Sequence, residues 1–147
     1  MHYLAFVLAA LVLFESPAAD ACVCGGTLAK AKDGSAAVFI GTITKRTQAK
    51  DCDPKQKPSC VSVFTYTVAV EGVFKGSVAK TVTVNSGRPK GTCSTGLAYR
   101  APTNTKWLFF SKSSAAPYEL RICGGTLQVT PKLNDFVTQQ LGAAKAP

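Results

Sequence analysis

Histidine is nearly absent from this sequence: His2 is the single histidine among 147 residues. It lies just before an apolar run that is typical of a cleaved secretory signal peptide, so we expect the mature chain to contain none. Without histidine, a chain cannot build a Ser-His-Asp triad, a Cys-His pair or an imidazole metal site. We therefore predict that the mature protein is not an enzyme and has no cofactor of its own.

Long apolar runs are also scarce. The one present extends over eleven residues from Leu4 to Phe14, which is shorter than the roughly 20 residues that span a bilayer. The small–x–small pattern Ala19-Asp20-Ala21 follows it and suits signal peptidase. We predict that residues 1–21 are a signal peptide. The mature domain, residues 22–147, is then secreted into the extracellular space and has no membrane span.

Acidic residues are few. The chain has 17 Lys and Arg against 8 Asp and Glu, a net charge of +9. Because Glu15 and Asp20 fall in the signal peptide, the mature chain keeps six acids and a net charge of +11. Such a charge favours acidic partners such as glycosaminoglycans or acidic protein faces. The basic residues are scattered, so the charge alone names no partner, and we expect no nucleic-acid partner.

Cysteine is the informative residue type that is present. All six cysteines lie in the mature chain, and a secreted chain of this kind is expected to form three disulfides. Six cysteines allow 15 pairings, and their spacing does not choose among them. The mature chain has no Asn-x-Ser/Thr acceptor for N-glycosylation.

Alternating apolar and β-branched residues predict a mainly β fold. The expected strands are Ala36–Thr44, Val61–Val70, Lys80–Asn85, Thr105–Phe110 and Tyr118–Cys123. Glu71-Gly72, among other turn signals, is expected to separate them. The segment Gln48–Cys60 is charged and holds two prolines, which predicts an exposed loop.

Two helices are expected at the ends of the domain. Thr27–Asp33 has helix formers after a capping threonine, and Gly34 is expected to end it. Pro131–Leu141 is expected to be amphipathic, with an apolar stripe of Leu133, Phe136, Val137 and Leu141. Five short antiparallel strands with few helices indicate a small sandwich or a closed five-stranded β-barrel of the OB type, which leaves no exposed sheet edge.

The mature chain would begin Cys22-Val23-Cys24. Such a Cys-x-Cys start resembles the N-terminal, netrin-like domain of the tissue inhibitors of metalloproteinases, here in a single-domain form. The resemblance extends over nearly all of residues 22–125 through Val38–Gly41, Tyr66–Gly76, Cys93 with Leu97 and Tyr99, Trp107–Phe110 and Cys123. It differs at Gly25-Gly26, where the family often has a proline. The fold that the resemblance implies is the OB-type barrel.

The family's disulfide pairing, carried onto matching positions, implies Cys22–Cys93 and Cys24–Cys123. The remaining pair is Cys52–Cys60, which does not match the family's usual third bridge. The resemblance also implies that Cys22, Val23 and Cys24 contact a target enzyme together with a ridge around the second cysteine of the first bridge. The ridge residues are Thr92, Cys93, Ser94 and Thr95.

The resemblance implies inhibition of secreted or membrane-tethered zinc metalloproteinases by a monomer. The free α-amino nitrogen and the carbonyl oxygen of Cys22 would bind the catalytic zinc of the enzyme and displace its water. Val23 would enter the primed-side specificity pocket. The alternative is a netrin-like binding module that inhibits nothing and holds a glycosaminoglycan or an acidic secreted partner through its basic surface.

Overall fold

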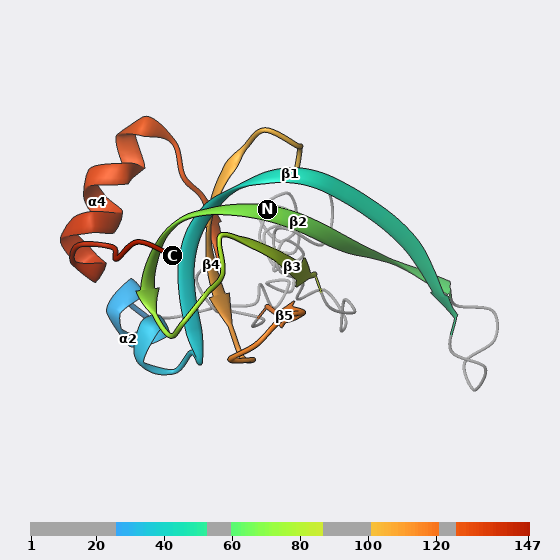
Figure 1. The fold of residues 1–147 in the computed structure, drawn as a ribbon, viewed down its shortest axis with the longest axis horizontal. Helices are drawn as coiled ribbons and strands as arrows, with labels where there is room; N and C mark the ends of the chain where they lie inside the picture. The colour runs from blue at the N-terminus through green and yellow to red at the C-terminus, as the bar shows by residue number, and fades with distance from the viewer. Residues whose placement is uncertain (1–25, 53–59, 87–100, 121–125) are drawn as a thin grey trace, which may run out of the picture.

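The computed structural model of the chain describes residues 26–52, 60–86, 101–120 and 126–147. Over these residues the fold is mainly β with two helices, as predicted (Figure 1). The elements are α2 (Leu28–Asp33), β1 (Ala37–Cys52), β2 (Cys60–Lys75), β3 (Thr81–Asn85), β4 (Lys106–Ser111), β5 (Tyr118–Glu119), β6 (Leu127–Gln128) and α4 (Pro131–Leu141).

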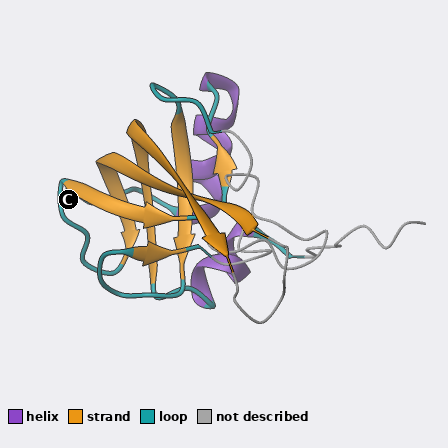
Figure 2. Cartoon of the chain, turned by 90° about the vertical axis from the view of Figure 1, so that its right-hand side faces the viewer, coloured by secondary structure: helices purple, strands orange, loops and turns teal. Residues whose placement is uncertain are grey.

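The strands form one six-stranded sheet in the order β5-β3-β2-β1-β4-β6. All neighbours pair antiparallel except β3 and β5, which are parallel. The sheet curls into a half-barrel, and both helices lie on one side of it (Figures 1 and 2). Register shifts in the long β1–β2 pair occur at three points between Val38 and Lys45. Such bulges increase local twist, which favours the curl.

The curl brings the two sides of the sheet together at one end. Ser111, at the end of β4, forms an antiparallel bridge with Leu120, directly after β5. The Lys112 amide donates to the Glu119 carbonyl oxygen at 2.9 Å, and the Leu120 amide donates to the Asn85 carbonyl oxygen at 3.4 Å. The chain at Glu119 and Leu120 therefore contacts both β3 and the end of β4.

Alternate residues of β1 serve two apolar cores. Phe39 faces the inside of the curl, where its ring lies 5.1 Å from that of Phe109 and 5.2 Å from that of Tyr118. Val38 and Ile40 face the other way, into a cluster that includes helix α4. This first half of β1 is thus buried on both faces, which explains why its sequence is an almost unbroken apolar run.

The predicted strands are found, but two boundaries are wrong. The expected loop Gln48–Cys60 is shorter, because residues 48–52 continue β1 and Cys60 belongs to β2. Glu71 and Gly72 do not form a turn, because β2 continues to Lys75 while paired with β1. The expected strand Tyr118–Cys123 is described only to Leu120. In both wrong cases, long-range pairing outweighs local turn propensity.

The helices match their predicted bounds closely. The side chain of Thr27 caps α2 by accepting from the Lys30 amide at 3.2 Å. In α4, Val137 and Leu141 are buried, but Leu133 is 37% exposed and Phe136 is 45% exposed. The predicted stripe is therefore only half right. Phe136 lies about 100° around the helix from Val137, outside the narrow face that meets the sheet.

Candidate functional site

The residues predicted to contact a target enzyme lie outside the described part of the chain. These are Cys22, Val23, Cys24, Thr92, Cys93, Ser94 and Thr95, and Cys123 falls there as well. The structure does describe the residues that flank these segments. Gly26 follows the segment with Cys22–Cys24, Ser86 and Ala101 flank the one with Thr92–Thr95, and Leu120 and Thr126 flank the one with Cys123.

Two of these flanking residues, Ser86 and Leu120, follow strands that pair with each other. Val84 pairs with Tyr118 and Asn85 with Glu119, so β3 and β5 end side by side. Ser86 follows β3 and is buried, with its amide donating to the Phe64 carbonyl oxygen at 2.9 Å. The segments that carry Cys93 and Cys123 therefore leave the sheet from adjacent, fixed backbone.

The chain after Cys24 and the chain after Cys123 also pack against a common part of the core. Leu28 in α2 and Leu127 in β6 pack against the same apolar cluster of β1, β4 and α4 residues. The Thr126 hydroxyl accepts from the Phe110 amide at 3.2 Å, which fixes the start of β6. These contacts hold the two segments on one side of the sheet.

Helix α2 is anchored by two lysines. The Lys75 ammonium donates to the carbonyl oxygens of Lys32 at 3.0 Å and Asp33 at 2.8 Å, at the C-terminal end of α2. Lys32 in turn donates to the carbonyl oxygen of Leu141, the last residue of α4, at 3.0 Å. Cations at helix C-termini satisfy unpaired carbonyls and complement the helix dipole. The two lysines therefore tie α2 to both β2 and α4.

The register of β1 and β2 places Cys52 directly opposite Cys60. The Ser86 amide donates to the Phe64 carbonyl oxygen, so the even-numbered residues of β2 direct their backbone groups away from β1. Cys52 and Cys60 are then a non-hydrogen-bonded pair, in which Cα atoms lie about 4.5 Å apart. This spacing is at the short end of the range that a disulfide spans.

A cation–aromatic contact that the sequence did not reveal lies where β1 leaves the main sheet. The Arg46 guanidinium lies 5.7 Å from the centroid of the Phe64 ring. Tyr66 is fully buried next to this pair. Burial raises the pKa of Tyr66, while a hydrogen bond with the Ala101 backbone and the charge of Arg46 oppose the rise. Arg46 pairs with Tyr66 in the register, so it reaches Phe64 as a diagonal neighbour two residues along β2 on the same face.

A second polar cluster lies on the outer face of the sheet. Glu71 accepts from the Thr42 hydroxyl at 2.6 Å and pairs with the Lys106 ammonium at 2.5 Å. Partial burial acts to raise the pKa of Glu71, but the hydrogen bonds from Lys106 and Thr42 and the Lys106 charge outweigh it and lower the pKa. The cluster ties β1, β2 and β4 together.

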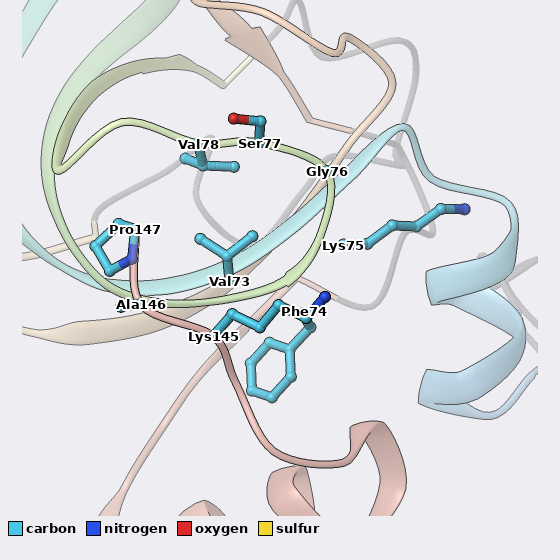
Figure 3. A pocket seen from close by; sticks show the side chains of 9 residues that line it. All are labelled: Val73, Phe74, Lys75, Gly76, Ser77, Val78, Lys145, Ala146 and Pro147. Atoms are coloured by element: carbon cyan, nitrogen blue, oxygen red, sulfur yellow. The ribbon is translucent and has the colours of Figure 1, made fainter.

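One pocket of about 190 Å³ lies where the C-terminal segment meets the end of β2 (Figure 3). Its lining residues are Val73, Phe74, Lys75, Gly76, Ser77, Val78, Lys145, Ala146 and Pro147. In Figure 3 the Lys75 side chain extends away from the pocket toward α2, in line with its hydrogen bonds there. The pocket contains none of the residues predicted to contact a target enzyme.

Within the described ranges, no three His, Cys, Asp or Glu side chains are grouped to hold a metal ion. Neither helix in this part of the chain has the length and apolar character needed to cross a bilayer. No model of a known protein family matches the chain, and no curated protein matches it either.

Proposed function

We propose that the protein is a secreted inhibitor of zinc metalloproteinases that binds the catalytic zinc through the α-amino group and carbonyl oxygen of Cys22. The observation that carries the proposal is that Leu28, four residues after Cys24, and Leu127, four residues after Cys123, pack against one apolar cluster. The mechanism needs a rigidly tied N-terminus, and this arrangement supports one.

The strand pairing supports a closed barrel of the OB type. β1 pairs with β2 and β4, β2 pairs with β3, and β3 pairs in parallel with β5. The bridge Ser111↔Leu120 adds contact between β4 and the chain after β5. A five-stranded barrel closes through this set of contacts, so we propose that the half-barrel is completed in this way.

The short tethers support the bridge Cys24–Cys123. Cys24 is two residues before Gly26, and Cys123 is three residues from both Leu120 and Thr126. An extended chain covers at most about 3.6 Å per residue, so each cysteine stays within about 7–11 Å of these flanking residues. Cys93 has longer tethers, seven and eight residues, and its proposed bridge to Cys22 rests on the family resemblance.

The chemistry follows from a free Cys22 amine. An α-amino group ordinarily titrates with a pKa of about 7.7–8.0, so its nitrogen loses its proton readily near neutral pH. Together with the carbonyl oxygen of the same residue it forms a five-membered chelate ring. A catalytic zinc keeps one position for water, and a ligand there removes the nucleophile of the enzyme.

The neighbouring residues supply affinity and selectivity in this proposal. The bridge from Cys22 to Cys93 would hold the N-terminus rigid, so little ordering entropy is lost on docking. Val23 is a β-branched apolar side chain and suits an apolar specificity pocket. Thr92, Ser94 and Thr95 would form the adjoining contact ridge.

The test is inhibition of a panel of zinc metalloproteinases by two forms of the protein. One starts at Cys22, and the matched form carries one alanine before it, which converts the amine into an amide. We expect the first form to inhibit and the second to lose at least about a hundredfold in potency, about 2.7 kcal/mol, because the lone pair of an amide nitrogen is delocalised and binds zinc poorly. Equal inhibition by both forms would exclude chelation.

The same two forms of the protein distinguish zinc chelation from the alternative, a binding module that inhibits nothing. If neither form inhibits and a heparin column retains both, with retention that falls steeply as salt increases, the basic surface is the functional feature. Exposed Lys45, Arg46 and Lys50 on β1 favour this second candidate.

A further inference from the structure

The second half of β1 continues past β4 and pairs only with β2. This extension, residues 44–52 with residues 60–67, is called the arm here; β3 still pairs with residues 65–67, so only its far end, residues 48–52 with residues 60–64, is two-stranded. Figures 1 and 2 show this arm extending beyond the other strands. All seven residues from Thr44 to Lys50 are exposed, although side chains in a strand alternate between two faces. This part of β1 thus contributes little to a core on either face, in contrast to residues 37–41, which are all buried.

The outer edge of the arm on β1 has no strand partner among the described residues. At Ile43 this edge is still covered, because the Ile43 amide donates to Thr105 at 3.0 Å and its carbonyl accepts from Asn104 at 2.7 Å. Beyond this point, β1 pairs only with β2. The described chain therefore leaves one edge of the arm open.

In a strand, alternate residues direct their N–H and C=O groups to opposite sides, and the pairing with β2 shows which residues of β1 face the open edge. The hydroxyls of Thr44 and Thr47 donate to the carbonyls of Thr67 and Thr65, so the odd-numbered residues of β2 direct their backbone groups toward β1. Their register partners Lys45 and Thr47 direct theirs toward β2. The alternate residues Arg46, Gln48 and Lys50 then present an N–H and a C=O outward.

Cross-strand contacts hold the arm in one conformation. Thr47 bonds the backbone of Thr65 at 3.2 Å, and the Gln48 amide group donates to the Ser62 hydroxyl at 2.9 Å. Arg46 lies over the ring of Phe64. An isolated two-stranded ribbon is only marginally stable in water. These cross-strand contacts add stability to the arm, so its outer edge is formed before a partner binds and less ordering entropy is lost on binding.

The charge of the edge selects the chemistry of its partner. Lys45, Arg46 and Lys50 are exposed cations, and Asp51 is the one acid among residues 44–52. Arg46 and Lys50 share a strand face about 13 Å apart, because four residues of strand separate them. Carboxylates on alternate residues of an added strand would lie next to these two cations.

We propose that the outer edge of β1 at Arg46, Gln48 and Lys50 is a docking site for an acidic, extended segment of a partner protein, which adds as a further strand. Main-chain hydrogen bonds to the three outward residues give the affinity, and the cations select for acidic residues. The site does not involve Cys22 and is independent of zinc chelation.

The probe is a fluorescent eight-residue peptide of alternating glutamate and valine, measured by fluorescence anisotropy with the full mature protein. We expect it to bind and to protect the amides of Arg46, Gln48 and Lys50 from hydrogen exchange. The same peptide with alternate backbone nitrogens methylated cannot pair with the edge and should bind at least about fivefold more weakly. This comparison leaves the protein unchanged, so it does not depend on a variant that folds.

Two protein variants locate the contact. Gln48→Pro removes one outward N–H that β2 does not use, and proline is tolerated at a sheet edge, so we expect about fivefold weaker binding than for Gln48→Ala. Arg46→Glu with Lys50→Glu should weaken binding about tenfold. The matched control, Lys112→Glu with Lys132→Glu, makes the same change in net charge on exposed residues away from the arm and should have little effect.

Several results would overturn the proposal. No binding of the probe would do so, as would equal binding of the methylated peptide. Equal effects of the two charge-reversal variants would assign the binding to long-range attraction, and displacement by heparin without amide protection would assign the surface to a polysaccharide. Self-association that Gln48→Pro abolishes, seen by sedimentation, would make the occupant a second copy of the chain.

Discussion

Gly41 shows how closely β1 and β2 approach in the curled part of the sheet. A Cβ atom on Gly41 would collide with the carbonyl oxygen of Ala69 and lie 2.8 Å from Cγ1 of Val68. Gly41→Ala should therefore destabilise the domain by about 1–3 kcal/mol, as overpacking does. Urea unfolding measures this. Because the nearest atom belongs to the backbone, Val68→Ala should not rescue the variant, and a rescue would show that the backbone contact is not limiting.

Glu71 gives the molecule a predictable response to acid. Its lowered pKa means that the fold favours the carboxylate, so its contribution is present above the ordinary pKa of glutamate and is lost as pH falls through the lowered value. At pH 7, Glu71→Gln should cost about 0.5 kcal/mol, because the ion pair is 40% exposed and screened by solvent. Thermal unfolding at pH 7 and pH 3 should show the difference shrinking toward zero.

The control for the Glu71 variant is Glu119→Gln. Glu119 is exposed on β5, and this change removes one negative charge without breaking the contact with Thr42 and Lys106. If both variants show the same loss at pH 7, the net charge rather than the local pair accounts for it.

At the scale of elements, the proposed disulfide between Cys52 and Cys60 would close the end of the arm. If Cys52 and Cys60 form the proposed disulfide, the closed nine-residue segment contributes roughly 2–3 kcal/mol in the chain-entropy account. In the variant with both changed to alanine, hydrogen exchange at Val63, in the two-stranded end of the arm, should accelerate. The Val70 amide, bonded to Lys80 at 2.8 Å in the main sheet, is the internal reference and should keep its protection. Equal acceleration at Val70 would mean that the arm is not a separate unit.

Helix α4 offers a matched pair of neighbouring side chains. Val137 is 1% exposed and Phe136 is 45% exposed. Val137→Ala should cost about 1–3 kcal/mol, whereas Phe136→Ala should change stability by less than about 0.5 kcal/mol. Chemical unfolding of both variants checks the ranking, and the reverse ranking would mean that the helix meets the sheet through another face.

The presence of most strands and of both described helices could be predicted, because their segments carry strong local sequence patterns. Thr27 before a run of helix formers and Pro131 before an amphipathic segment mark both helix starts. The length of the β1–β2 pair was not predictable, since Gln48–Cys52 is polar and gains its strand form only from pairing with Cys60–Phe64. Strand β5 (Tyr118–Glu119) falls within the predicted strand Tyr118–Cys123, whereas the two-residue strand β6 is too short to carry a pattern of its own and is defined by its pairing with β4.

At the scale of the whole molecule, the sequence and the structure support different parts of the proposed site. The proposed mature start Cys22-Val23-Cys24 suggests the chemistry, because only an N-terminal residue has a free amine next to its own carbonyl. The structure contributes the scaffold: β3 and β5 end side by side, and α2 and β6 share one apolar cluster. The contact residues themselves, Cys22–Cys24 and Thr92–Thr95, carry no periodic pattern, so only the resemblance identified them.

The most direct measurement of the central claim is the visible spectrum of a metalloproteinase whose zinc has been replaced by cobalt(II). Cobalt absorption changes when a ligand enters its coordination sphere and displaces water. Added protein that starts at Cys22 should change the spectrum in a one-to-one titration, and the form with one alanine before Cys22 should leave it unaltered. An unchanged spectrum while the enzyme is inhibited by the Cys22 form would contradict chelation and show that the protein blocks the active site without touching the metal.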